Sequence, residues 1–121
     1  MQVQQGRRRA ARVLAATGAA AGIALLTRPG SVTATVAPEF PAARLWIARV
    51  LGARLVAQHL AVLVSPEPAA LRRSAAVDGL HAASMLPVLA LPRYRRAALV
   101  SGGFAAVSAF GARLLAGSQR R

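Results

Sequence analysis

The stretch from Val77 to Leu86, "VDGLHAASML", places an acidic residue and a histidine inside an apolar run. Asp78 and His81 are three positions apart, so on a helix their side chains share one face. The chain has only three acidic residues and two histidines, which makes this placement unusual. Burying a charged side chain alone is costly. The fold must therefore bring a basic side chain to Asp78.

The composition limits the chain to one small domain without thiol chemistry. Its 121 residues allow one domain at most, 55% of them are hydrophobic, and cysteine is absent. Disulfides, thiol nucleophiles and cysteine metal sites are therefore excluded. All 16 basic residues are arginine, and the formal net charge is +13. A chain this basic and this apolar is typical of either a nucleic-acid binder or a membrane protein.

The placement of the arginines favours the membrane. Most of them gather in short clusters between long uncharged runs, as charges do beside membrane-spanning helices. The clusters are Arg7, Arg8, Arg9 and Arg12; Arg72 and Arg73; Arg93, Arg95 and Arg96; and Arg120 and Arg121. One tyrosine and three phenylalanines provide no row of aromatic rings to stack on bases. We therefore expect a lipid bilayer, and no nucleic acid, as partner.

Four segments are candidate membrane-spanning helices, at about 13–27, 45–64, 74–91 and 97–116. The first is marginal, since its 15 residues make about 22 Å of helix against a hydrocarbon core of about 30 Å. A soluble four-helix bundle is the alternative, but its helices would each need a polar face, which the first and fourth segments lack. We expect an all-α, four-transmembrane-helix up-down bundle at 13–117, with basic tails at 1–12 and 118–121.

The connections between these segments differ in length. Residues 28–44 form the longest, with three prolines and an extended "SVTATV" at 31–36. The links "SPEPAALRR" at 65–73 and "PRYRR" at 92–96 are short, and short links force neighbouring helices to run antiparallel. The second, third and fourth segments are therefore expected to form one compact unit.

Charge counting leaves the orientation in the membrane open. With all four segments inserted, nine arginines lie on the side of the N-terminus and five on the other. If the first segment does not cross the membrane, nine arginines again lie on the side of the N-terminus and five on the other. Hydropathy favours insertion, because residues 13–27 have no polar face to leave in water. The chain is then a multi-pass protein of the inner (plasma) membrane with cytoplasmic termini. The alternative is a cleaved signal sequence, since "TVA" at 35–37 loosely fits a cleavage site, although Pro38 disfavours cutting there.

The first segment contains "GAAAG", in which Gly18 and Gly22 are four residues apart. Two glycines at this spacing leave a groove that lets another helix backbone approach closely, which favours association in lipid. An alanine-rich helix produces such pairs by chance. Close packing of helices is therefore preferred over a dedicated dimer face as the role of these two glycines.

Polar residues of the second and third segments are expected to meet in the middle of the membrane. They form two stripes: Arg54 and Gln58 on the second segment, and Ser74, Asp78 and His81 on the third, where Met85 shares the same face. Matching depths across the short hairpin brings position 54 near 81 and position 58 near 77. A lone charge at a helix centre costs about 2.5–3.5 kcal/mol. Arg54 and Asp78 are therefore the predicted ion pair, with Gln58 and His81 as hydrogen-bond partners.

Three further residues are expected to lie apart from these stripes. Arg49 projects nearly opposite Arg54 and should extend to the membrane interface. His59 points about 100° away from Gln58, towards another helix or the lipid headgroups. Pro87 is expected to bend the third helix, because its ring frees the carbonyl four residues earlier.

The cluster of Arg54, Gln58, Asp78 and His81 has three interpretations. It is a structural ion pair that fixes helix register, or a site that handles protons or substrate, since intramembrane Asp, His and Arg compose proton relays and anion sites. Metal or haem ligation by His59 and His81 is disfavoured, because their depths differ by about 7 Å and a third strong ligand is missing. Without a Ser–His–Asp arrangement, phosphate-binding loop or carboxylate pair, we expect no enzyme, metal or cofactor.

Two stretches of the chain form a recognisable pair of motifs, "RVLGARLVAQHL" at Arg49–Leu60 and "AAVDGLHAASMLPVLALPRYRRAAL" at Ala75–Leu99. They resemble the paired motifs of small uncharacterised four-helix membrane proteins from actinobacteria. The proteins share an LGAR helix followed by a D-x-x-H-x-x-S-M helix, and the likeness covers about the middle half of this chain. The resemblance links Arg54, Gln58, Asp78 and His81 into one constellation and implies no established activity.

These observations together predict a structural or accessory membrane component that associates with itself or with a larger membrane complex. The alternative is a small proton-linked transporter or channel subunit that uses Asp78 and His81. The sequence identifies no small-molecule substrate.

Overall fold

The computed structural model describes residues 1–117, which consist of helices and turns without a strand. The elements are α1 (Gln2–Thr27), α2 (Pro29–Val36), a short 3-10 helix η1 (Ala42–Arg44), α3 (Leu45–Val64), α4 (Pro68–Val88) and α5 (Pro92–Gly117). The expected basic tail at 118–121 lies outside the described residues. The all-α class is confirmed.

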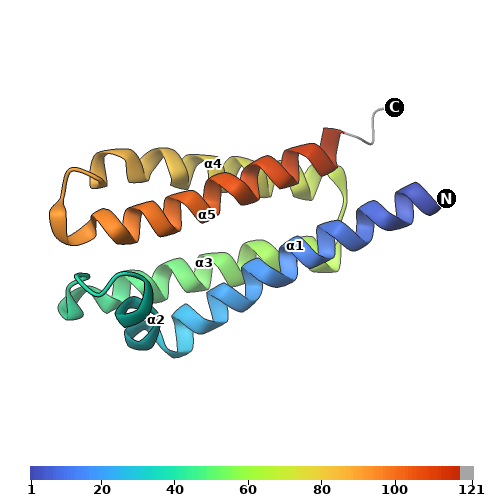
Figure 1. The fold of residues 1–121 in the computed structure, drawn as a ribbon. Helices are drawn as coiled ribbons and strands as arrows, with labels where there is room; N and C mark the ends of the chain where they lie inside the picture. The colour runs from blue at the N-terminus through green and yellow to red at the C-terminus, as the bar shows by residue number, and fades with distance from the viewer. Residues whose placement is uncertain (118–121) are drawn as a thin grey trace.

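The four long helices run along one axis in alternating directions (Figure 1). The start of α1, the α3–α4 turn and the end of α5 lie at one end of the molecule, called here the terminal end. The short α2 and the α4–α5 turn lie at the opposite end, called the loop end. The topology is therefore up-down-up-down, as expected.

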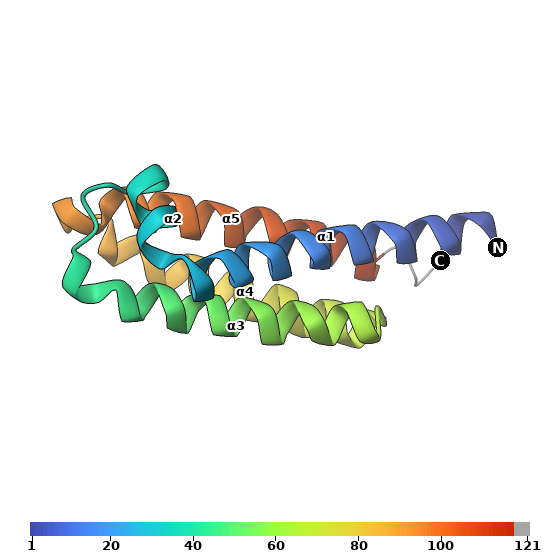
Figure 2. The same ribbon diagram turned by 90° about the horizontal axis from the view of Figure 1, so that it is seen from below.

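The helices form two pairs rather than one compact unit of the last three helices. Helix α1 packs along α3, and α4 packs along α5, whereas α3 and α4 have little mutual contact (Figures 1 and 2). The expectation that the second, third and fourth segments form one unit was therefore wrong. The short α3–α4 turn fixes their antiparallel direction but leaves open how closely the two helices pack.

Prolines set the starts of three helices. Pro29, Pro68 and Pro92 are the first residues of α2, α4 and α5. Proline suits the first helical position because its fixed φ matches the helix and its missing N–H would have no partner there. Helices α4 and α5 consequently begin at 68 and 92, before the expected residues 74 and 97. The arginines expected in the two links lie within the first two turns of these helices instead.

Three other boundaries differ from expectation. The segment 1–12, expected as a tail, belongs to α1, which begins at Gln2. The arginines of this segment favour the helix, because arginine is a good helix former. The expected extended "SVTATV" is helical in α2, where the Thr33 hydroxyl donates to the carbonyl of Pro29. Pro87, expected to bend the third helix, lies in the last turn of α4, which ends one residue later at Val88.

Three helices of the described chain are long and apolar enough to cross a membrane, namely Gln2–Thr27, Ala42–Val64 and Pro92–Gly117. Four such helices were expected, and α4 is the one that does not qualify. Arg72, Arg73, Asp78 and His81 all lie within α4 and lower its mean hydropathy. By length and composition, therefore, residues 1–117 contain three candidate spans.

Small side chains fill the interior, and large apolar side chains cover the outside. Among the described residues, Leu55, Val62 and Leu71 are the only buried hydrophobic residues larger than alanine. Each long helix instead exposes large apolar residues, including Val13, Ile23, Val50, Leu60, Leu80, Leu86, Val107 and Phe110. Helices in lipid pack through small residues, because burial of large ones brings no gain from water exclusion. The distribution is consistent with a membrane protein.

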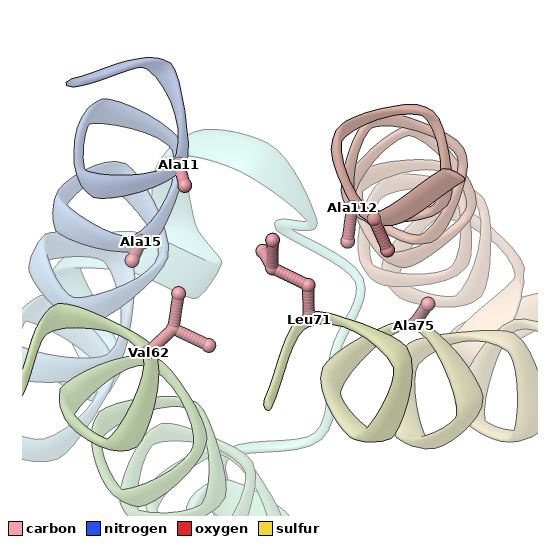
Figure 3. Packing of buried hydrophobic residues seen from close by; sticks show 7 residues of the cluster. Ala11, Ala15, Val62, Leu71, Ala75 and Ala112 are labelled. Carbon is pink, nitrogen blue, oxygen red and sulfur yellow. The ribbon is translucent and has the colours of Figure 1, made fainter. Parts of the chain in front are cut away.

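A small apolar cluster joins the two helix pairs towards the terminal end. It consists of Ala11 and Ala15 from α1, Val62 from α3, Leu71 and Ala75 from α4, and Ala112 and Ala116 from α5. Figure 3 shows Val62 and Leu71 in the space between the pairs. Leu71 is 2% exposed. Leu71 thus anchors the start of α4 against the α1–α3 pair.

Glycines allow α1 and α3 to pack closely. A Cβ atom at Gly22 would lie 2.7 Å from the carbonyl oxygen of Gly52, and a Cβ at Gly52 would lie 2.7 Å from the carbonyl oxygen of Gly22. Gly18, one turn earlier, lies against the ring of His59. Both glycines of "GAAAG" therefore face α3, and Gly52 is a further packing residue that the sequence analysis did not identify.

The glycine contact predicts that Gly52→Val destabilises the protein by about 1–3 kcal/mol, because the added atoms collide with the backbone of α1. Thermal unfolding of the purified protein in detergent measures the effect. Gly103→Val is the matched control, since a Cβ at Gly103 meets nothing within 4 Å. Equal melting temperatures for the two variants would contradict the packing described here.

Candidate functional site

Polar side chains of α3 and α4 form a layer midway along the bundle. This polar layer consists of Arg54, Gln58 and His59 from α3 and Ser74, Asp78 and His81 from α4. The helical period places each set within two turns of its helix. Because α3 and α4 run antiparallel, the two sets lie at similar depths.

Arg54 and Asp78 form an ion pair across the gap between α3 and α4. The Nη1 atom of Arg54 lies 3.7 Å from Oδ1 of Asp78, which is longer than a hydrogen bond. The Asp78 side chain is 0% exposed and that of Arg54 is 27% exposed. Within residues 1–117, neither carboxylate oxygen of Asp78 has a hydrogen-bond partner. The attraction between the two charges therefore stabilises this buried carboxylate.

Gln58 links Arg54 to α4 by hydrogen bonds. Nη1 of Arg54 donates to Oε1 of Gln58 at 3.1 Å, and Nε2 of Gln58 donates to Oγ of Ser74 at 2.9 Å. The same Nε2 is 3.4 Å from the Ser74 carbonyl oxygen. Arg54, Gln58, Ser74 and Asp78 thus connect two helices that have little other contact.

His81 lies beside this pair and hydrogen-bonds to α5. Its Nε2 is 3.4 Å from Oγ of Ser101, and the Ser84 hydroxyl donates to its carbonyl at 2.7 Å. The expected hydrogen bond between His81 and the Arg54–Asp78 pair is not formed. Because α4 packs along α5, the face that carries His81 is directed towards Ser101.

Of the residues expected outside the stripes, His59 and Arg49 lie in different surroundings. His59 is 2% exposed and packs on Gly18 of α1, so its neighbour is another helix and not the lipid headgroups. Its Nε2 has no hydrogen-bond partner in the described part of the chain. Arg49 is exposed on the outside of α3.

His59 and His81 do not come together as ligands. His59 faces α1 and His81 faces α5, on opposite sides of the polar layer. In the described range 1–117, no three His, Asp or Glu side chains are grouped closely enough to hold a metal ion.

An apolar cavity of about 540 Å³ extends from the polar layer to the loop end, with residues from α1 to α5 in its walls. Leu25, Val32, Leu51, Met85, Ala97 and Phe104 are among the apolar residues that line it. Arg54, His81 and Ser101 line it at the level of the polar layer. At the loop end, Phe40 and Tyr94 contact each other edge to face, with ring centroids 5.5 Å apart, and both line the cavity.

Sequence reasoning did not identify this cavity. Its walls depend on the separation of the two helix pairs and on the fold of α2, and neither is encoded in the periodicity of a single segment. Arg54 and His81 were candidate residues for other reasons. Ser101 gave no signal, because a single serine in an alanine-rich helix is unremarkable.

The chain matches no protein-family model, no curated protein and no solved structure. The resemblance to small actinobacterial membrane proteins therefore stays a prediction.

The ion pair predicts an order of stability among charge variants. Arg54→Ala should lower the free energy of unfolding by about 3–5 kcal/mol, because it leaves the buried Asp78 carboxylate without a positive charge. Arg54→Ala with Asp78→Ala should cost less than Arg54→Ala alone, since no unpaired charge remains. Unfolding of the purified variants in detergent measures both.

Arg49→Ala is the control for this comparison, because Arg49 is exposed on the same helix. It should leave the melting temperature close to that of the unaltered protein. Equal losses of stability in the single and the double variant would show that the ion pair does not stabilise the fold.

Proposed function

We propose that the chain is a multi-pass protein of the inner (plasma) membrane in which all four long helices cross the bilayer. Its role in this proposal is that of a structural or accessory component. The observation that carries the proposal is the placement of large apolar side chains outside and small or polar ones inside. A protein with this surface requires a lipid environment to cover it.

The orientation of α4 supports a fourth crossing despite its low mean hydropathy. Ser74 and Asp78 are buried, at 5% and 0% exposed, while Leu80 and Leu86 are 75% and 67% exposed on the outer face. A helix that turns its polar residues inward presents an apolar face to lipid. Helix α4 also lies alongside α5 and parallel to the same axis (Figure 1).

The ends of the bundle have the features of membrane interfaces. The described arginines near the terminal end are Arg7, Arg8, Arg9, Arg12, Arg72, Arg73 and Arg113, and those near the loop end are Arg28, Arg44, Arg93, Arg95 and Arg96. The larger set favours a cytoplasmic terminal end. Trp46 and Tyr94, near the starts of α3 and α5, belong to the loop end, and such rings are enriched at interfaces.

The polar layer supports a structural role. Its ion pair and hydrogen bonds connect the α1–α3 pair to the α4–α5 pair, where apolar contact between α3 and α4 is slight. Asp78 is the one acidic side chain of the chain that belongs to this layer, and paired acids for acid–base catalysis are absent from the sequence. The proposal therefore assigns no catalytic step. Its partners are the bilayer and either a second copy or a larger membrane complex.

Cysteine labelling tests whether α4 crosses the membrane. The chain has no cysteine, so Ser65→Cys in the α3–α4 turn and Ala90→Cys in the α4–α5 turn each give a single thiol at an exposed position. In right-side-out vesicles, an impermeant maleimide should label position 90 and leave position 65 unlabelled until the membrane is opened. Labelling of both positions from one side would contradict a crossing by α4.

A small proton-linked transporter or channel subunit is the second candidate function. The observation that favours it is that Asp78 has few contacts with its neighbours. It forms an ion pair with Arg54 at 3.7 Å, but neither of its carboxylate oxygens accepts a hydrogen bond within the described residues. Both oxygens of this carboxylate therefore keep free acceptor sites. Intramembrane acids with this freedom are typical of proton pathways.

Proton flux in liposomes separates the two functions. A structural role predicts no flux above that of empty liposomes, whereas the second candidate predicts a flux that Asp78→Asn abolishes. The asparagine variant keeps the size of the side chain while losing its titratable group. Its helix content by circular dichroism must equal that of the unaltered protein. Flux that is the same with and without Asp78→Asn would exclude a proton step at this residue.

A further inference from the structure

We propose that a groove at the terminal end, between the start of α1 and the end of α3, binds the phosphate of an anionic phospholipid. The start of α1 extends past the α3–α4 turn (Figures 1 and 2). The inference rests on the proposed membrane function, because it takes the terminal end to lie at the lipid headgroups. It adds the class of lipid that this end recognises. The lining residues that carry the argument are Arg8, Arg9, Arg12, Val13, Ala16 and Leu63.

The lining of the groove changes from basic to apolar along α1. Arg9 lies nearer the start of the helix, Arg12 follows, and Val13 and Ala16 lie further towards the middle of the bundle. Arg9, Arg12 and Ala16 are spaced three and four residues apart, so they share one face of the helix. The other lining residues of α1 precede Arg9 and are two glutamines, a glycine and an arginine. The groove therefore has a basic outer part and an apolar inner part, which Leu63 of α3 completes.

The carboxylates of the chain do not neutralise this basic part. The chain has three acidic residues, Glu39, Glu67 and Asp78. The first lies at the loop end, and the third is buried in the polar layer. Glu67 lies 3.9 Å from Arg8, but both side chains are more than half exposed, and such surface pairs contribute little. Arg9 and Arg12 form no ion pair within residues 1–117, so their counter-charge comes from outside the chain.

Two guanidinium groups on one helix face suit a phosphate group. Arginine presents paired N–H donors that bind two phosphate oxygens at once. Basic clusters directly beside a membrane-spanning helix attract anionic lipids through the same charges.

The apolar inner part favours a phospholipid over a soluble phosphate or a nucleic acid. Val13 is 62% exposed, so its side chain is available for contact with an acyl chain. A free phosphate has no apolar part to place beside Val13, Ala16 and Leu63. A nucleic acid would also lack stacking partners, because none of the described lining residues is aromatic. A phospholipid carries its phosphate and its acyl chains in the order that the groove presents.

Two phospholipids with the same acyl chains test the inference. They are palmitoyl-oleoyl phosphatidylglycerol and palmitoyl-oleoyl phosphatidylcholine, each titrated onto the full-length protein purified in detergent. Native mass spectrometry counts the bound lipid molecules and gives the affinity of the first one. Phosphatidylglycerol should bind more tightly, because the positive charge of choline opposes the arginines.

Paired arginine variants assign this preference to the groove. Arg9→Gln with Arg12→Gln should weaken phosphatidylglycerol binding about tenfold, as expected for the loss of charge-assisted hydrogen bonds. Arg72→Gln with Arg73→Gln removes the same charge and should leave the affinity unchanged. It is the matched control, because both arginines are exposed near the terminal end and neither lines the groove.

A second pair of variants tests the apolar part with all arginines retained. Ala16→Trp fills the groove beside Val13 and should weaken the binding of phosphatidylglycerol. Ala20→Trp is its control, because Ala20 is exposed on the same helix and does not line the groove. The melting temperature of each variant in detergent verifies that it is folded.

Each alternative result overturns the inference in a defined way. Equal losses from the two arginine pairs would show a general attraction of charge without a site. Glycerol 3-phosphate that competes as well as the lipid would show a site for a soluble phosphate, and a DNA duplex that displaces the lipid would show a nucleic-acid site. Unchanged binding to the Ala16→Trp variant would place the acyl chains elsewhere. These measurements do not depend on whether α4 crosses the membrane, which the cysteine labelling decides separately.

Discussion

The buried carboxylate of Asp78 constrains how the two halves of the protein can be arranged. It has no exposed surface, so its charge must be balanced from within, and Arg54 lies 3.7 Å away. The ion pair requires α3 and α4 to keep a fixed position relative to each other along the bundle axis. The hydrogen bond between Gln58 and Ser74, one helical turn away, requires the same position. Helices that pack through alanine and glycine have smooth surfaces that do little to prevent one helix from sliding along another. A polar contact at one defined depth fixes the register of the two helices.

Within each helix pair, close backbone approach replaces the burial of large side chains. Gly22 and Gly52 face each other across α1 and α3, and in α5 a Cβ at Gly102 would lie 3.2 Å from the Cβ of Met85. The large residues are left for the outer surface. The tight packing of each pair and the apolar outer surface therefore follow from the same division between small and large residues, which is consistent with a membrane protein.

The sequence allowed the Arg54–Asp78 contact to be anticipated because two local rules sufficed. The helical period defined the stripes, and the short α3–α4 link matched their depths. Partners that depend on which helices pack together could not be anticipated in this way: His81 faces Ser101 on α5, and His59 faces Gly18 on α1. Helix starts were misplaced because charged residues were taken as boundaries, whereas Pro68 and Pro92 set them earlier.

The cavity exists because the α1–α3 pair and the α4–α5 pair contact each other more closely at one end of the bundle than at the other. Towards the terminal end, Leu71 and Val62 fill the space between them, and at mid-depth the ion pair bridges it. Towards the loop end, α2 and Phe40 contribute to the walls of a space that remains between the pairs. A short polar bridge can hold two helix pairs in register without apolar packing beyond it. The contact that balances the charge of Asp78 therefore also places Arg54 at the wall of this cavity, where the two helix pairs begin to separate.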